Sequence, residues 1–150
     1  MSDETVERHE FHVGITWTGG KEGIITLSGK PPLPLTSPVY WEGKPDAYSP
    51  HDLFISAVSG CYITTFASMM QRMKQPLQTH EVSGHGTLQK HPKGGWLFTD
   101  IYITMEITIP KDATLSQVER AVELTKKYCH ISRSIASKVH VKATIHQLDE

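Results

Sequence analysis

The feature that most constrains this chain is a long apolar segment that begins at Ser49 and must end before Pro76. Ser49, Pro50 and Asp52 have the arrangement of an N-cap, a first-turn proline and a capping-box acid. Because Pro76 cannot continue a helix, we expect this helix to run to about Lys74. Apolar side chains cover more than one of its faces, which is typical of a central helix covered on most sides. These side chains are Phe54, Ala57, Val58, Cys61, Tyr62, Thr65, Phe66, Met69, Met70 and Met73.

Alternating apolar and polar residues predict strands before this helix. Residues 11–17 read as a half-buried strand that ends at Gly19-Gly20, and residues 23–27 read as its hairpin partner. Residues 30–38 contain four prolines, so they predict a loop or an edge strand.

The second half of the chain predicts two paired strands, a helix and a final strand. Residues 101–109 alternate clearly, with residues 80–89 as the partner strand. Thr114 and Gln117 have the form of a capping box that opens a helix to about Tyr128. Residues 139–145 form the last strand, so the order β-β-(β)-α-β-β-α-β predicts an α+β fold with mainly antiparallel pairing.

Length and composition predict one domain over residues 1–150. The 15 basic and 16 acidic residues give a net charge of -1, which favours neither nucleic acid nor an anionic membrane. Apolar stretches are interrupted before about 18 residues, so we expect no membrane span. The acidic, polar N-terminus is unlike a signal peptide, and we expect a cytoplasmic protein.

The predicted central helix is long for so few strands. A helix of about 25 residues is roughly 37 Å long. Four or five strands leave part of its apolar surface bare, so we expect a homodimer in which two such helices pack between two sheets.

Cys61 and Cys129 are the only cysteines. From the residues alone, a cysteine on an apolar helix is more often packing than chemistry. The alternative is a redox pair, in which one thiol attacks a peroxide and the other resolves the product as a disulfide. Cys129 precedes a short periodic segment, and capping it would lower the pKa of its thiol. Cys61 lies inside a helix, so its activation requires a neighbour that folding supplies.

Three segments resemble the OsmC/Ohr family of proteins. Residues 49–61 (SPHDLFISAVSGC) resemble its first signature, in which a proline and an acid lead into a helix that carries a cysteine. Residues 127–135 (KYCHISRSI) resemble its second, a Cys-x-x-Ser segment, and residues 17–23 (WTGGKEG) resemble its early glycine turn. The segments occur in the family's order and span most of the chain.

The resemblance implies an intertwined homodimer with active sites at the subunit interface. It implies thiol-dependent reduction of organic hydroperoxides, including fatty-acid hydroperoxides. Cys61 would become a sulfenic acid, and Cys129 would resolve it as a disulfide. The family also implies no bound cofactor and an external dithiol of the lipoyl type as the reductant.

The chain departs from the family at two supporting positions. Family members place an arginine after the glycine pair and a glutamate after the helix proline; this chain has Lys21 and His51 there, with Asp52 adjacent. Lysine keeps the charge but loses the bidentate guanidinium. Lys21, His51 and Asp52 are therefore the candidate supporting residues, and Arg8 and Arg133 are other candidates for the missing cation.

Two other functions compete with a peroxidase. Nine histidines suggest a metal site, but no ligand motif joins them, and solvated strand histidines explain them better. We therefore predict no metal. The second alternative is an OsmC-like domain that binds an apolar small molecule at the dimer interface without catalysis.

Overall fold

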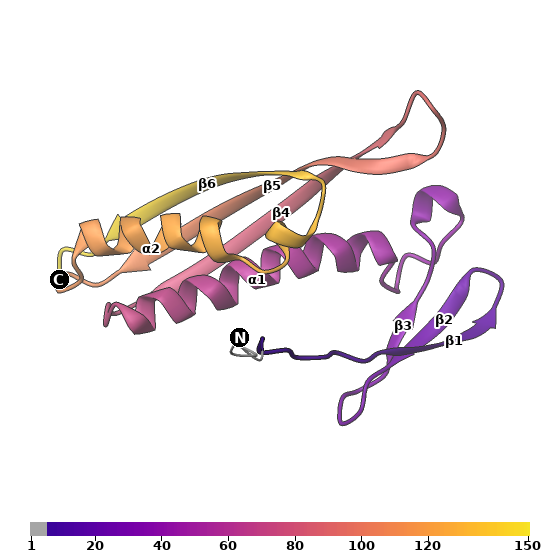
Figure 1. The fold of residues 1–150 in the computed structure, drawn as a ribbon, viewed down its shortest axis with the longest axis horizontal. Coiled ribbons are helices and arrows are strands. Elements are labelled where there is room, and N and C mark those ends of the chain that lie inside the picture. Colours follow the sequence, from indigo (N-terminus) through magenta and orange to yellow (C-terminus); the bar gives the residue numbers. More distant parts are fainter. Residues whose placement is uncertain (1–5) are drawn as a thin grey trace, which may run out of the picture. The chain divides into compact units, whose positions relative to one another are not determined.

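A computed structural model describes residues 6–150 and divides the chain into two compact units, which meet in sequence between Leu53 and Phe54 (Figure 1). The elements follow the predicted order, so that prediction is confirmed. The prediction of one domain over residues 1–150 stays a prediction. In chain order the elements are β1 (Gly14–Gly19), β2 (Glu22–Thr26), β3 (Leu33–Leu35), α1 (Pro50–Arg72), β4 (Thr79–Lys90), β5 (Trp96–Ile109), α2 (Leu115–Tyr128) and β6 (Lys138–Gln147), with short 3-10 helices η1 (Val39–Trp41) and η2 (Ser132–Ser134).

The first unit contains an antiparallel sheet in the order β1-β2-β3. Gly19 and Gly20 turn β1 into β2 with φ angles of 127° and 54°, which favour glycine. The predicted hairpin and the proline-rich edge strand are confirmed. The prediction of a half-buried first strand is wrong: Phe11 precedes β1, and Ile15 and Trp17 are 57% and 73% exposed. Within residues 6–53, no other segment buries these two side chains.

The predicted capping box of α1 is present. The Asp52 carboxylate accepts hydrogen bonds from the Ser49 backbone N–H and hydroxyl, both at 2.9 Å. In return, the Ser49 hydroxyl oxygen accepts the Asp52 N–H at 3.1 Å. This reciprocal pairing satisfies donors that a helix start leaves free.

The second unit contains the sheet β4-β5-β6, with β4 antiparallel and β6 parallel to the central strand β5. Alternate side chains of β5 point into the core and are fully buried, which confirms the predicted periodicity. They are Ile101, Ile103, Met105, Ile107 and Ile109. In Figure 1, α1 and α2 lie alongside each other and along the strands of this sheet.

Two glycines of β4 mark a close approach between this strand and α1. A side chain at Gly84 would collide with the Ser59 hydroxyl, and one at Gly86 would lie 2.5 Å from the Ile55 side chain, both on α1. Val58, Tyr62, Phe66, Met69 and Met70 are the buried residues of α1. The opposite face is exposed, as expected for a single chain, and its coverage by a second copy stays a prediction. Between Phe54 and Met70, the exposed residues are small: Ser56, Ala57, Gly60, Thr64, Ala67 and Ser68.

The helix predicted after Thr114 is present, but its capping box is not. Thr114 is the N-cap of α2 and makes no side-chain capping bond. Its backbone N–H instead donates to the Gln75 side-chain oxygen at 2.8 Å. A residue 39 positions away therefore fixes this helix start, which local sequence cannot reveal.

One described helix, α1, has the length and mean hydropathy (1.5 over its most apolar window) that would allow a membrane crossing. The expectation that every apolar stretch is too short to span a membrane is therefore wrong for α1, judged by its length and composition. The buried residues of α1 belong to the hydrophobic core of the second unit.

Replacing Gly84 with valine tests the close approach of α1 to β4. Because the new side chain must displace Ser59 or shift α1, we expect Gly84→Val to lower the free energy of unfolding by about 1–3 kcal/mol. Ser83→Val places the same side chain on the exposed face and should change it by less than about 0.5 kcal/mol. Urea unfolding followed by circular dichroism measures both, and equal stability of the two variants would contradict this packing.

Candidate active site

Cys61 and Cys129 are distant in sequence but adjacent in the fold. Cys61 lies at mid-length on α1 and is partly exposed, whereas Cys129 ends α2 and is fully buried. Both are free thiols, and the Cys129 thiol is a hydrogen-bond partner of the Cys61 sulfur. The structure therefore brings together the two cysteines that the sequence singles out.

The turn after α2 directs backbone N–H groups toward these sulfurs. Burial raises the pKa of Cys61, but hydrogen bonds from the backbone of Ile131 and His130 and from the Thr65 and Cys129 side chains outweigh it, so the net pKa is lowered. The Thr65 hydroxyl lies 3.5 Å from the sulfur. Successive N–H groups in a turn form an anion-binding concavity. Cys61 is thus the thiol that ionises more easily, and its activation comes from neighbours that folding supplies, as expected.

Cys129 does not have the lowered pKa that the sequence predicts. Its carbonyl accepts the Arg133 N–H at 3.2 Å, so a single turn does follow it. Burial is the largest effect on its thiol and raises the pKa, and the neighbouring Cys61 raises it further, whereas the Ser132 hydroxyl and N–H lower it. The prediction failed because the sequence does not show that this position is fully buried. The pair therefore combines one easily ionised thiol with one that keeps its proton.

Tyr62 and Ser132 brace the turn that carries Cys129. Burial raises the pKa of Tyr62, and its phenol makes a hydrogen bond with the Ser132 side chain. The Ser132 hydroxyl also lies 3.3 Å from the Cys129 carbonyl oxygen. Ser132 belongs to the Cys-x-x-Ser segment, so its place beside Cys129 gives that spacing a physical role.

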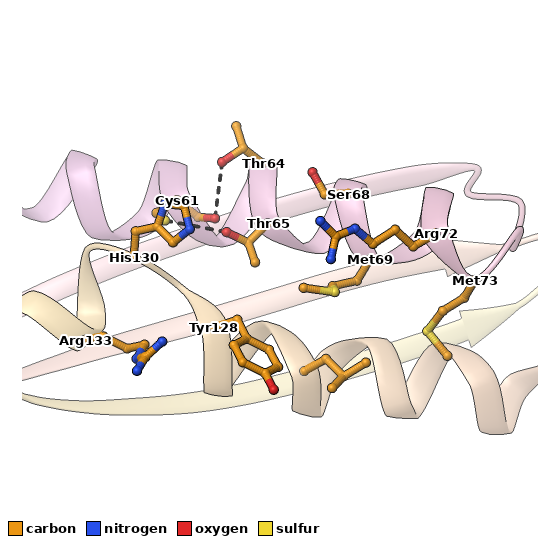
Figure 2. Close-up of a pocket in the computed structure, with 11 residues that line it drawn as sticks. Cys61, Thr64, Thr65, Ser68, Met69, Arg72, Met73, Tyr128, His130 and Arg133 are labelled. Atoms are coloured by element: carbon orange, nitrogen blue, oxygen red, sulfur yellow. Dashed lines mark hydrogen bonds between the residues drawn. The ribbon is translucent and has the colours of Figure 1, made fainter. Parts of the chain in front are cut away.

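Cys61 opens into a groove of about 630 Å³ in the second unit (Figure 2). Apolar side chains from α1 and α2 form part of its wall, as expected for a site that accepts an alkyl group. Two guanidinium groups, those of Arg72 and Arg133, also line it. The full lining is Cys61, Thr64, Thr65, Ser68, Met69, Arg72, Met73, Leu124, Tyr128, His130 and Arg133.

The groove contains one of the two arginines that the sequence proposes as the missing cation. Arg133 lines it, whereas Arg8 belongs to the first unit. Sequence reasoning missed Arg72, although its spacing was a usable signal. Arg72 is eleven residues after Cys61, about three helical turns, and therefore lies on the same face of α1.

The three candidate supporting residues have partners within the first unit. The Lys21 ammonium donates to the Trp41 carbonyl at 3.1 Å and lies 3.9 Å from a Glu42 carboxylate oxygen. Asp52 caps α1 through Ser49. The His51 ring lies 5.8 Å from that of Trp41. A supporting role for Lys21, His51 or Asp52 at Cys61 stays a prediction.

The histidines form no metal site among the described residues. Residues 6–150 contain no group of three or more histidine, cysteine or acidic side chains that could hold an ion. His140 and His146 instead pair with Asp100 and Glu106, at 2.8 and 3.2 Å.

His80 is not the solvated strand histidine that the sequence predicts. It packs edge-on against the Phe66 ring, and burial lowers its pKa.

Comparison with known proteins agrees with this arrangement. The family model for OsmC-like proteins matches residues 43–144. The chain belongs to the OsmC-like family. The uncharacterized protein YmaD of Bacillus subtilis is 26% identical over 138 residues, which cover 89% of this chain and 91% of YmaD.

Solved structures of OsmC-like proteins share the fold. An OsmC-like protein of unknown function from Vibrio cholerae has a TM-score of 0.82 at 17% identity, covering 91% of this chain and all of that one. An organic hydroperoxide resistance protein from Elizabethkingia anophelis has a TM-score of 0.72 at 19% identity, covering 95% of this chain and all of that one. OsmC-like proteins are soluble proteins, which agrees with α1 as a core helix.

Adjacent threonines in this OsmC-like groove offer a matched test of the Cys61 environment. The Thr65 hydroxyl contacts the sulfur, whereas the Thr64 hydroxyl donates to the Gly60 and Cys61 carbonyls, both at 3.3 Å. Thr65→Val removes a hydrogen bond to the thiolate, so we expect the Cys61 pKa to rise and alkylation by iodoacetamide at pH 7 to slow about tenfold. Thr64→Val should leave the rate within about twofold. Peptide mass spectrometry measures the alkylation rate of Cys61 across pH 5–9. Similar slowing in both variants would contradict the assigned contact between Thr65 and the Cys61 sulfur.

Proposed function

We propose that this protein reduces organic hydroperoxides, including fatty-acid hydroperoxides, through Cys61 and Cys129. The observation that carries the proposal is the pair itself: a thiol with a lowered pKa beside a buried thiol with a raised pKa, at a groove partly lined by apolar side chains. Several solved structures with this fold are named organic hydroperoxide resistance proteins, which supports the same reaction class.

In the first step, the Cys61 thiolate attacks the terminal oxygen of the hydroperoxide. The oxygen–oxygen bond breaks, Cys61 becomes a sulfenic acid, and the alkoxide leaves as an alcohol after taking a proton. The N–H groups of His130 and Ile131 hold the sulfur as a thiolate before the attack. Arg133, which lines the groove, supplies positive charge in place of the family's arginine.

In the second step, the Cys129 sulfur attacks the Cys61 sulfenic acid. A disulfide forms, and the Cys129 proton leaves with the sulfenic oxygen as water. An external dithiol of the lipoyl type then reduces the disulfide by exchange, becomes a cyclic disulfide itself and restores both thiols. The raised pKa of Cys129 suits this order, because the resolving thiol stays protonated until the sulfenic acid exists.

Turnover of cumene hydroperoxide with dihydrolipoamide tests this function. We expect the wild type to consume peroxide and Cys61→Ser to do so at a rate at least about a thousandfold lower. Cys129→Ser should accumulate a Cys61 sulfenic acid or mixed disulfide. Peroxide loss is followed by ferrous xylenol orange and the sulfenic acid by dimedone labelling.

The competing function would give a different result in the same assay. Lys21 and His51 stand where the family has arginine and glutamate, which favours a domain that binds an apolar molecule without catalysis as the second candidate. Equal, background rates for the wild type and both serine variants would overturn the peroxidase and leave that candidate.

We also propose that two copies form a homodimer through the exposed face of α1 and act in the cytoplasm. Small residues at Ala57, Gly60 and Ala67 would let a second helix approach closely. A side chain added at Gly60 meets no atom within 4 Å in the single chain, so the fold accommodates it.

Replacing Gly60 separates dimer formation from folding. We expect Gly60→Gln to fold normally but to elute as a monomer in size-exclusion chromatography with light scattering, because the new side chain occupies the interface. Ser116→Gln, on the exposed surface of α2, should remain a dimer. A Gly60→Gln protein with the wild-type dimer mass would exclude this face as the interface.

A further inference from the structure

Arg72 lies on the same face of α1 as Cys61. Cys61, Thr65, Ser68 and Arg72 are separated by four, three and four residues, which is the spacing of one helical stripe. Eleven residues correspond to a rise of about 16 Å. Figure 2 shows the Arg72 side chain reaching back along the groove toward Ser68 and Met69. A guanidinium group therefore faces the groove on the side remote from the sulfur.

No carboxylate compensates this charge within the groove. None of the residues that line it is acidic. Over residues 6–150, the structure records no ion pair for Arg72, whereas Glu123 on α2 pairs with Lys126 at 3.0 Å. Arg133 adds a second cation to the same groove. A cleft lined by charges of one sign concentrates ligands of the opposite sign.

Apolar side chains occupy the stretch between the sulfur and Arg72. Met69 comes from α1, and Leu124 and Tyr128 come from α2, so both helices contribute. A volume of about 630 Å³ lies within the usual range for a site that holds a molecule of drug or lipid size. The ligand that complements a reactive sulfur, an apolar wall and a remote cation is an amphipathic anion.

We propose that Arg72 is a specificity-determining residue that binds the anionic group of the substrate, a carboxylate or a phosphate monoester, while Cys61 attacks the remote hydroperoxide. Arg133 assists attraction near the sulfur, and Arg72 selects charged over neutral alkyl hydroperoxides. Guanidinium groups pair with both anions through two parallel hydrogen bonds. The inference rests on the proposed function for its substrate, but the binding step is testable without turnover.

Calorimetric titration with chains that lack a peroxide tests the binding step alone. Dodecanoate, dodecyl phosphate and dodecanol share the alkyl chain and differ in head group. We expect the wild type to bind at least one of the two anions about five- to tenfold more tightly than the alcohol, and Arg72→Gln to lose that preference. The anion bound more tightly identifies the head group. Arg120→Gln removes an arginine of α2 that does not line the groove and should keep the preference.

A kinetic comparison extends the test to the reaction. The hydroperoxide of linoleic acid carries a carboxylate, whereas that of its methyl ester is neutral. The ratio of kcat/KM for the acid to kcat/KM for the ester therefore measures the effect of the charge. We expect this ratio to be about five to ten in the wild type and in Arg120→Gln. In Arg72→Gln we expect it to approach one, because KM for the acid rises.

The two assays distinguish the two proposals. Equal affinities for anions and alcohol in the wild type, or the same preference in Arg72→Gln, would overturn the role of Arg72 even if peroxide is consumed. Selective anion binding that depends on Arg72, in a protein that reduces no hydroperoxide, would support the anion site and overturn the peroxidase instead.

Discussion

The contact between the middle of α1 and the turn after α2 is the constraint on which the candidate site depends. α1 is held against the inner face of the second sheet by buried residues such as Tyr62 and Phe66 and by close approach at Gly84. The buried end of α2 then brings Cys129 and its following N–H groups to Cys61. Side-chain packing thus fixes the chemistry, because neither sulfur obtains its partners from local sequence.

Because backbone N–H groups surround Cys61, its thiolate does not depend on a cationic side chain for stabilisation. Family members are expected to hold the thiolate with an arginine–glutamate pair, but here backbone N–H groups and the Thr65 hydroxyl lower the pKa of Cys61. Backbone donors need no particular side chain, so the pKa of Cys61 is lowered in a chain that has Lys21 and His51 at the family's supporting positions. Under the proposed function, Arg72 and Arg133, which line the groove, would attract and orient the substrate.

Periodicity and helix-end signals were enough to predict the order of helices and strands along the chain, α1 and its capping box. They failed where distant residues decide the outcome. Gln75 rather than Gln117 satisfies the start of α2, Cys129 is fully buried, and His80 packs on Phe66. The meeting of the two cysteines followed from family resemblance, whereas the N–H groups around Cys61 required coordinates. Only Arg72 could have been found earlier, from its helical spacing.

The direct test of the central claim is the oxidation state of both sulfurs after one equivalent of cumene hydroperoxide. Non-reducing peptide mass spectrometry should find a Cys61–Cys129 disulfide within one chain, with neither sulfur over-oxidised. Cys61 in the sulfinic state beside an unmodified Cys129 thiol would contradict the account, because it would show that the buried sulfur does not reach its partner.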